Sequence, residues 1–173
     1  MNKSAEDLQT FYEERGDIKG RKVCWLGDGN NVCHSYMNAA TLLDFELHVA
    51  SPEGYEPDKS LLASCGSHVN IERDPGIAVR DADLIVTDVW ASMGQEAEQE
   101  GRSKALSAYQ LNRPLLELAA PDVLYMHCLP AHRDEEITAE LLDASNSIIW
   151  KEAENRLHAQ KALMEYLLSK KPL

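Results

Sequence analysis

The chain has 173 residues, 44% of them hydrophobic, and its 29 acidic against 17 basic side chains give a formal net charge of −12 at pH 7. This length and apolar content suit a folded domain with its own core and exclude an intrinsically disordered chain. The acidic surplus argues against nucleic acid or an anionic membrane as partner, and no apolar run approaches the ~20 residues of a membrane span. The four cysteines form no CxxC pair, so we expect a reduced, cytoplasmic protein.

Strand-like apolar runs alternate with helical patterns along the whole sequence. A capping-box pattern at Ser4 and a helix-stopping glycine at Gly16 predict a first helix over 5–15, with Leu8, Phe11 and Tyr12 as its apolar stripe. Strands are predicted at 22–26, 46–50, 68–71, 84–88 and 123–127, with a sixth strand-like run at 147–150. Helices are predicted after the loop 27–31, at 60–64, up to Tyr109, from Pro114 and over 152–168.

This alternation, with short connections, implies right-handed crossovers and a parallel sheet covered on both faces. We predict a doubly wound, Rossmann-like α/β fold of about five strands in the order 3-2-1-4-5. In such a sheet, ligands bind beyond the carboxyl ends of the strands, where the strand order reverses. Polar or reactive residues follow three of the predicted strands, and Asn31, Asp88 and Cys128 are therefore expected to converge on one crevice.

The glycine-rich loop has more than one reading. Gly27-x-Gly29 opens a helix after a strand, as in dinucleotide-binding folds, but Val32 occupies the third glycine position and the second strand does not end in an acid. Asn30 and Asn31 can hold a carboxylate at the helix N-terminus, or they can simply cap the helix. A nucleotide-binding α/β module is therefore the weakest of the functional hypotheses.

Asp88 and Cys128 can also be explained by purely structural roles. A carboxylate that ends an apolar strand can serve as a cap or turn residue for the following loop. A free cysteine is more often a small core side chain than a nucleophile. Cys128 and His132 together supply only two metal ligands, which do not make a site. Neither residue decides the function when it is taken alone.

Five motifs, in order and spacing, resemble the ornithine carbamoyltransferases, specifically their C-terminal, ornithine-binding domain. They are GDGNNV at 27–32 followed by HS at 34–35, ASPEGY at 50–55, DVWASMGQE at 88–96, HCLP at 127–130 and EAENR at 152–156. The resemblance runs through nearly the whole chain. The SMG and HCLP segments favour ornithine over aspartate as the substrate within the wider transcarbamoylase group.

The resemblance implies an enzyme of arginine biosynthesis that transfers a carbamoyl group from carbamoyl phosphate to the δ-amine of ornithine, giving citrulline and phosphate. It implies no metal and no organic cofactor. The residues that would hold the amino-acid end of ornithine are Asn31, Asp88, Ser92 and Met93. Those near the δ-amine and the carbamoyl phosphate would be Cys128, Leu129 and Arg156.

The Ser-x-Arg-Thr-Arg and His-Pro-x-Gln motifs, with which the family's N-terminal domain binds carbamoyl phosphate, do not occur in this sequence. We therefore expect residues 1–173 to form a single ornithine-binding domain that keeps both interdomain helices, about 5–15 and 152–168. We expect this chain alone to be inactive without a carbamoyl phosphate domain. It should self-associate through apolar side chains on those helices, namely Leu8, Phe11, Leu157, Met164 and Leu168. The alternative is a non-catalytic amino-acid-binding or scaffold module derived from the family.

Overall fold

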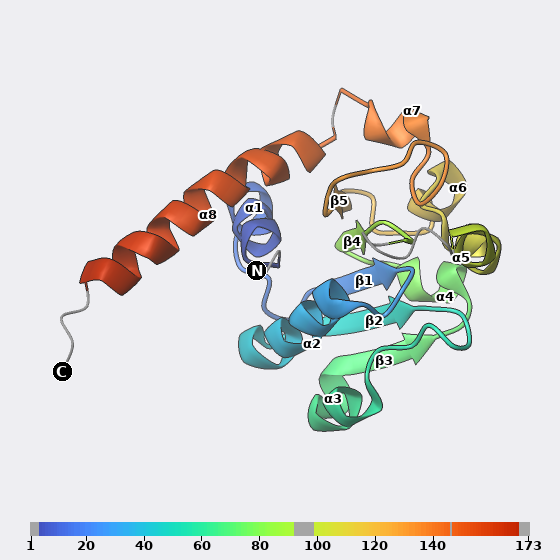
Figure 1. Cartoon of the computed structure of the whole chain (residues 1–173), viewed down its shortest axis with the longest axis horizontal. Coiled ribbons are helices and arrows are strands. Elements are labelled where there is room, and N and C mark those ends of the chain that lie inside the picture. The colour runs from blue at the N-terminus through green and yellow to red at the C-terminus, as the bar shows by residue number, and fades with distance from the viewer. Residues whose placement is uncertain (1–3, 92–98, 146, 170–173) are drawn as a thin grey trace.

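The computed structural model describes residues 4–91, 99–145 and 147–169, and a five-stranded sheet lies at its centre (Figure 1). The strand order is β3-β2-β1-β4-β5, and every pairing is parallel. The predicted fold class, strand order and strand direction are therefore confirmed. The strands are β1 (Lys22–Leu26), β2 (Glu46–Ala50), β3 (Val69–Glu72), β4 (Leu84–Thr87) and β5 (Leu124–His127).

Helices and short helical turns connect these strands. They are α1 (Ser4–Arg15), α2 (Asn31–Leu43), α3 (Lys59–Ser64), α4 (Pro75–Val79), α5 (Gln99–Leu106), α6 (Arg113–Leu116), α7 (Ala139–Leu142) and α8 (Ile149–Ser169), with 3-10 turns η1 (Gly66–His68) and η3 (Ser107–Tyr109). The short helices α4 and α7 were not predicted. None of the described helices is long and apolar enough to cross a membrane.

The predicted sixth strand is wrong. Ser147 and Ile148 lie outside regular structure, and α8 begins at Ile149. The Ser147 hydroxyl accepts a hydrogen bond from the Ile149 amide, and the Glu152 amide donates to the Ile148 carbonyl. Ile149 is buried while the next residue, Trp150, is 55% exposed. The apolar run is thus the first turn of a helix, and its length of four residues could not separate the two possibilities.

Alternate residues of the strands build two cores, one on each face of the sheet. Val23 and Trp25 of β1 belong to the core that α1 and α2 cover, whereas Cys24 and Leu26 belong to the core that α4 and α7 cover. Successive strand residues point to opposite faces, so a strand buried on both faces reads as a continuous apolar run. This double covering explains why the strands were easily found in the sequence.

Helices α1 and α8 pack against each other (Figure 1), and their ion pairs show that the two helices run in opposite directions along the contact. Lys151 of α8 bonds Glu14 of α1, at 2.6 Å between Nζ and Oε1, whereas Arg156, further along α8, bonds Glu6, at 3.0 Å between Nε and Oε1. Helix α8 then continues beyond this contact, and residues 161–169 are all exposed. Phe11 of α1 is fully buried in the core. Its predicted role in self-association is therefore wrong, because its ring already packs beneath α1.

Candidate functional site

Three strand ends lie side by side at the carboxyl edge of the sheet. Leu26 of β1 is the register partner of Thr87 of β4, which is in turn the partner of His127 of β5. Asp88 and Cys128 follow directly, and the Cys128 amide donates to the Thr87 carbonyl at 3.3 Å. Both side chains are buried. The strand topology thus brings together two residues that lie forty positions apart, beside the point between β1 and β4 where the strand order reverses.

The asparagine that precedes α2 both caps this helix and holds Asp88. The Asn30 side-chain oxygen accepts hydrogen bonds from the amides of Val32 and Cys33, at 2.8 and 3.1 Å. Its side-chain nitrogen donates to Asp88 Oδ2 at 3.1 Å. Asn31 is the first residue of α2 and its side chain is exposed. Of the two readings left open for these asparagines, capping is what Asn30 does, whereas Asn31 faces solvent at the same helix end.

Gly29 is required by close packing within the protein. A Cβ atom at this position would collide with the backbone of Glu56 and Pro57. The Gly29 amide also donates to the Tyr55 carbonyl at 2.8 Å. The close contact between Gly29 and the 55–57 segment is enough to explain why the second position of the loop is a glycine, and a bound phosphate is not needed to explain it.

Arg102 of α5 crosses from one loop of this edge to another. Its guanidinium pairs with Asp28, donates to the Trp90 carbonyl, and lies 5.0 Å from the centre of the Tyr55 ring. Burial raises the pKa of Asp28, and the Arg102 charge opposes that rise. Arg102 therefore links the loop after β1, which carries Asp28, to the segment after β4, which carries Trp90. Ser92 and Met93, to which the family resemblance gives a role in ornithine binding, lie outside the described residues.

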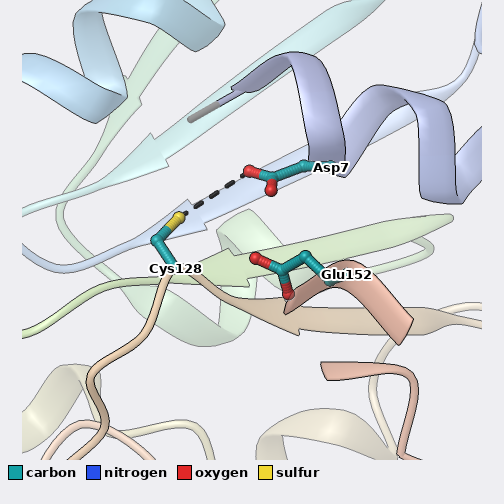
Figure 2. A group of neighbouring side chains, drawn as sticks. All are labelled: Asp7, Cys128 and Glu152. Atoms are coloured by element: carbon teal, nitrogen blue, oxygen red, sulfur yellow. Dashed lines mark hydrogen bonds between the residues drawn. The ribbon is translucent and has the colours of Figure 1, made fainter. Parts of the chain in front are cut away.

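Cys128 belongs to a buried cluster with two carboxyl groups. Figure 2 shows Asp7 on α1 and Glu152 at the start of α8, both beside Cys128 in the segment that follows β5. The Cys128 thiol donates to Asp7 Oδ2 at 3.7 Å, and the Tyr36 hydroxyl donates to the same oxygen at 2.7 Å. Glu152 Oε2 accepts from the His127 amide at 3.0 Å. A potential ligand atom from each of Asp7, Cys128 and Glu152 lies within 4.8 Å of the other two.

Burial sets the electrostatics of this cluster. Desolvation raises the pKa of Asp7 to about 6. Desolvation also raises the pKa of Glu152 well above its usual range, and the neighbouring Asp7 carboxylate adds to that rise. Two carboxyl groups this close cannot both ionise without strong repulsion, so the pair keeps a proton to a higher pH than a separate exposed carboxyl group would. The cluster can therefore store or pass a proton beside the Cys128 thiol, and the same atoms are within reach of a single cation.

Arg156 lies one helical turn beyond Glu152, and its positive charge opposes the rise in the Glu152 pKa. Its guanidinium is held by Glu6, which is almost fully buried, while the Arg156 side chain is one-third exposed. Leu129 follows Cys128, and its amide donates to the His127 carbonyl at 2.8 Å. Cys128 and Leu129 thus follow β5, and Arg156 lies on α8, which contacts β5.

The sequence reasoning missed several residues of this edge. Asp7, Tyr36 and Arg102 are not among the site residues that the sequence predicts. A signal did exist for Asp7, because it stands next to Leu8 on a helix whose other face is charged, and an acid on an apolar face needs a partner.

Comparison with known proteins decides the family. Residues 19–167 match the family described as aspartate/ornithine carbamoyltransferase, Asp/Orn binding domain. The chain belongs to this family. Its resemblance to ornithine carbamoyltransferases, inferred from the five sequence motifs, is thereby confirmed.

The carbamoyltransferase relatives are considerably longer than this chain. It is 58% identical over 167 residues to an ornithine carbamoyltransferase of Nitrosococcus oceani, covering 96% of this chain and 55% of that protein. The corresponding protein of Hydrogenovibrio crunogenus is 56% identical over 164 residues, covering 95% of this chain and 54% of the relative. The chain thus spans about half the length of the curated carbamoyltransferases it matches.

Two solved structures of ornithine carbamoyltransferases also match this chain over only part of their own length. The ornithine carbamoyltransferase of Pyrococcus furiosus superposes with a TM-score of 0.85 at 51% identity, over 94% of this chain and 55% of that one. The anabolic enzyme of Campylobacter jejuni gives a TM-score of 0.91 at 31% identity, over 98% of this chain and 58% of the other.

Proposed function

We propose that this chain is the ornithine-binding half of an ornithine carbamoyltransferase. In the reaction, the δ-amine of ornithine attacks the carbamoyl carbon, a C–N bond forms, the C–O bond to phosphate breaks, and the amine gives up a proton. The observation that carries the proposal is the pairing of Thr87 with His127 at the ends of β4 and β5, which puts the following residues, Asp88 and Cys128, next to each other. It supports one crevice with an acidic end and a thiol end, in a chain whose relatives are named for this reaction.

The amino-acid end of ornithine would bind at the Asp88 side of the crevice. A carboxylate suits the α-ammonium group, and the exposed Asn31 amide at the start of α2 suits the α-carboxylate, which the positive end of the helix dipole also favours. Asn30 would fix the Asp88 carboxylate through its 3.1 Å hydrogen bond, so that the group is oriented before substrate arrives. Ser92 and Met93 would complete this end of the site.

The δ-amine would lie beside Cys128 and the Leu129 carbonyl. This amine must be neutral to attack, and with a pKa of ~10.4 its deprotonation at pH 7 costs roughly 4–5 kcal/mol. Asp7, with a pKa of about 6, is too weak a base to supply that alone. Desolvation of the amine must therefore lower its pKa, and the Cys128–Asp7–Glu152 cluster would then accept or relay the proton.

Carbamoyl phosphate would be shared with a second half of the enzyme. Arg156 can stabilise charge on this ligand, but one hydrogen bond to a charged group is worth only ~1.5–3 kcal/mol, and a phosphate dianion needs several donors. The missing donors would come from a domain that carries the Ser-x-Arg-Thr-Arg and His-Pro-x-Gln motifs. Glu6 would hold Arg156 in place until that domain binds.

Calorimetry tests the proposal. The chain is titrated with ornithine, with lysine and with aspartate, each in the presence and absence of carbamoyl phosphate. We expect binding of ornithine in preference to both others, and an affinity about tenfold weaker or worse in Asp88→Asn, since a charge-assisted contact is lost. Asp81→Asn is the matched control, because Asp81 is exposed and has a positive φ that asparagine tolerates.

Three outcomes would contradict the proposal: no ornithine binding under either condition, tighter binding of aspartate, or equal ornithine affinity in the Asp88 and Asp81 variants. Thermal unfolding of both variants, measured alongside, separates a lost contact from a lost fold.

A further inference from the structure

A second group of potential ligand atoms lies on the turn that follows Cys128, Leu129 and Pro130. A potential ligand atom from each of His132, Glu135 and Glu136 lies within 4.8 Å of the other two. The carboxylate of Glu136 is fully buried, whereas the His132 side chain is nearly half exposed. Nothing in the proposed ornithine chemistry uses these three side chains.

The two oxygens of Glu136 have different surroundings. Oε1 is well satisfied, because it is 2.8 Å from His127 Nε2 and accepts from the His132 amide at 2.6 Å. Oε2 is buried, and among the described residues it has no hydrogen-bond donor. It faces His132 Nδ1 at 3.8 Å, which is too long for a hydrogen bond. A buried carboxylate oxygen without a donor calls for an explanation, and a bound cation is one.

From this geometry we infer a binding site for a divalent transition-metal ion of the zinc type, formed by His132 Nδ1, a Glu135 oxygen and Glu136 Oε2. One imidazole nitrogen with two carboxylates is a donor set that suits zinc, whereas calcium and magnesium take oxygen ligands. Tetrahedral coordination with bonds of about 2.0–2.2 Å puts the ligand atoms about 3.3 Å apart. The 3.8 Å separation of His132 Nδ1 and Glu136 Oε2 is already close to that value.

The backbone holds the three ligands in place. The Glu135 amide donates to the His132 carbonyl at 3.1 Å, which closes the turn. The Gln110 side chain donates to the Glu135 carbonyl at 2.8 Å, and the Leu111 amide donates to the Glu136 carbonyl at 2.9 Å. His132 and Glu135 are the more accessible of the three side chains, so they are the ones that would rotate to close the site around an ion.

The ion would link the turn at 132–136 to the end of β5, because Glu136 is also hydrogen-bonded to His127. It would therefore stabilise the segment that carries Cys128 and Leu129 without touching substrate. The site is separate from the Asp7–Cys128–Glu152 cluster, and ornithine binding at Asp88 does not depend on it. The two proposals can fail independently.

The test uses the whole chain with Cys128→Ser, which removes the thiol of the other cluster. After dialysis against a chelator, Zn²⁺ is titrated calorimetrically into this parent and into the same chain with His132→Ala or Glu135→Gln. His158→Ala is the matched control, since His158 is an exposed histidine of α8 that lies 4.0 Å from a glutamate. We expect one ion per chain in the parent, an affinity weaker by about tenfold or more in both ligand variants, and a change below about twofold in the control.

Two further measurements complete the test. Co²⁺ should give visible d–d absorption in the Cys128→Ser parent, and His132→Ala should abolish it. Zn²⁺ should raise the unfolding temperature of the parent, and the rise should be absent in both ligand variants. The inference is overturned if the parent binds no ion, or if His132→Ala and Glu135→Gln bind Zn²⁺ as tightly as the parent does.

Discussion

The sulfur of Cys128 lies 3.7 Å from a carboxylate oxygen of Asp7, a residue 121 positions earlier in the chain. The same oxygen accepts the Tyr36 hydroxyl at 2.7 Å, so α1, α2 and the end of β5 meet at one carboxyl group. Any change that moves α1 is therefore transmitted to the thiol. The packing of this terminal helix is part of the candidate active site.

The raised pKa of Asp7 makes stability depend on pH. Its pKa rises from the usual 3.8 to about 6 on burial, so between these pH values the folded chain binds more protons than the unfolded chain. Stability must then fall as the pH rises from about 4 to about 6, by at most about 3 kcal/mol from this group. Asp7→Asn removes the charge and leaves an oxygen for Tyr36. We expect the variant to gain stability relative to the parent as the pH rises through this window, and to keep at least that advantage above it, because it also removes the Asp7 charge that raises the pKa of Glu152.

Urea unfolding at several pH values from 4 to 8 measures this difference. Asp17→Asn serves as the control, since Asp17 is exposed, and its stability should follow the parent at every pH. If the Asp7→Asn and parent profiles run parallel through the window, the Asp7 carboxyl group does not titrate as stated.

The sequence predicted the sheet better than it predicted the side-chain network around the site. Runs such as Leu84–Thr87 are buried on both faces and mostly apolar, and in a parallel sheet the strand order then places Asp88 and Cys128 together. The Asp7–Cys128 contact could not be predicted, because it depends on how α1 packs across the sheet. The role of Arg102 could not be predicted for a similar reason, since its partners Asp28 and Trp90 lie on other loops.

Arg102 should matter far more than a surface arginine. It is 10% exposed and pairs with Asp28, which is 19% exposed, whereas Arg113 and its partner Glu140 are about half exposed. Arg102→Met leaves a largely buried carboxylate without its cation, and we expect a loss of about 2–4 kcal/mol of unfolding free energy. Arg113→Met should cost less than about 1 kcal/mol, because exposed pairs contribute little.

Chemical denaturation of both single variants makes this comparison. The double variant Arg102→Met with Asp28→Asn should recover part of the loss, since it removes the unpaired charge. Equal losses in the Arg102 and Arg113 variants, or no recovery in the double variant, would show that the Asp28 pair is not the source.

Activity should require a second domain. We expect the purified chain to form no citrulline from carbamoyl phosphate and ornithine, because its sequence contains neither carbamoyl phosphate motif of the family. Citrulline should appear when a separately produced N-terminal half of a related enzyme is added, and Cys128→Ala should abolish that activity. A citrulline-forming activity of the chain alone that disappears in Cys128→Ala would refute this expectation, provided that host transcarbamoylase has been removed.

The part of α8 that follows Arg156 should drive self-association. Leu157, Met164 and Leu168 are 67%, 58% and 87% exposed, and their spacing of seven and four residues puts them on one face of the helix. A second copy could bury this face and remove apolar surface from water. The net charge of −12 opposes the association at low ionic strength, so added salt should strengthen it by screening the repulsion.

Sedimentation equilibrium at low and high salt measures this association. Replacement of all three side chains by glutamine should leave a monomer under both conditions. Leu42→Gln is the control, because Leu42 is 82% exposed on α2 and lies outside the proposed contact; this variant should associate as the parent does. A parent that stays monomeric at high salt, or a triple variant that associates equally well, would exclude this face of α8 as the contact between copies.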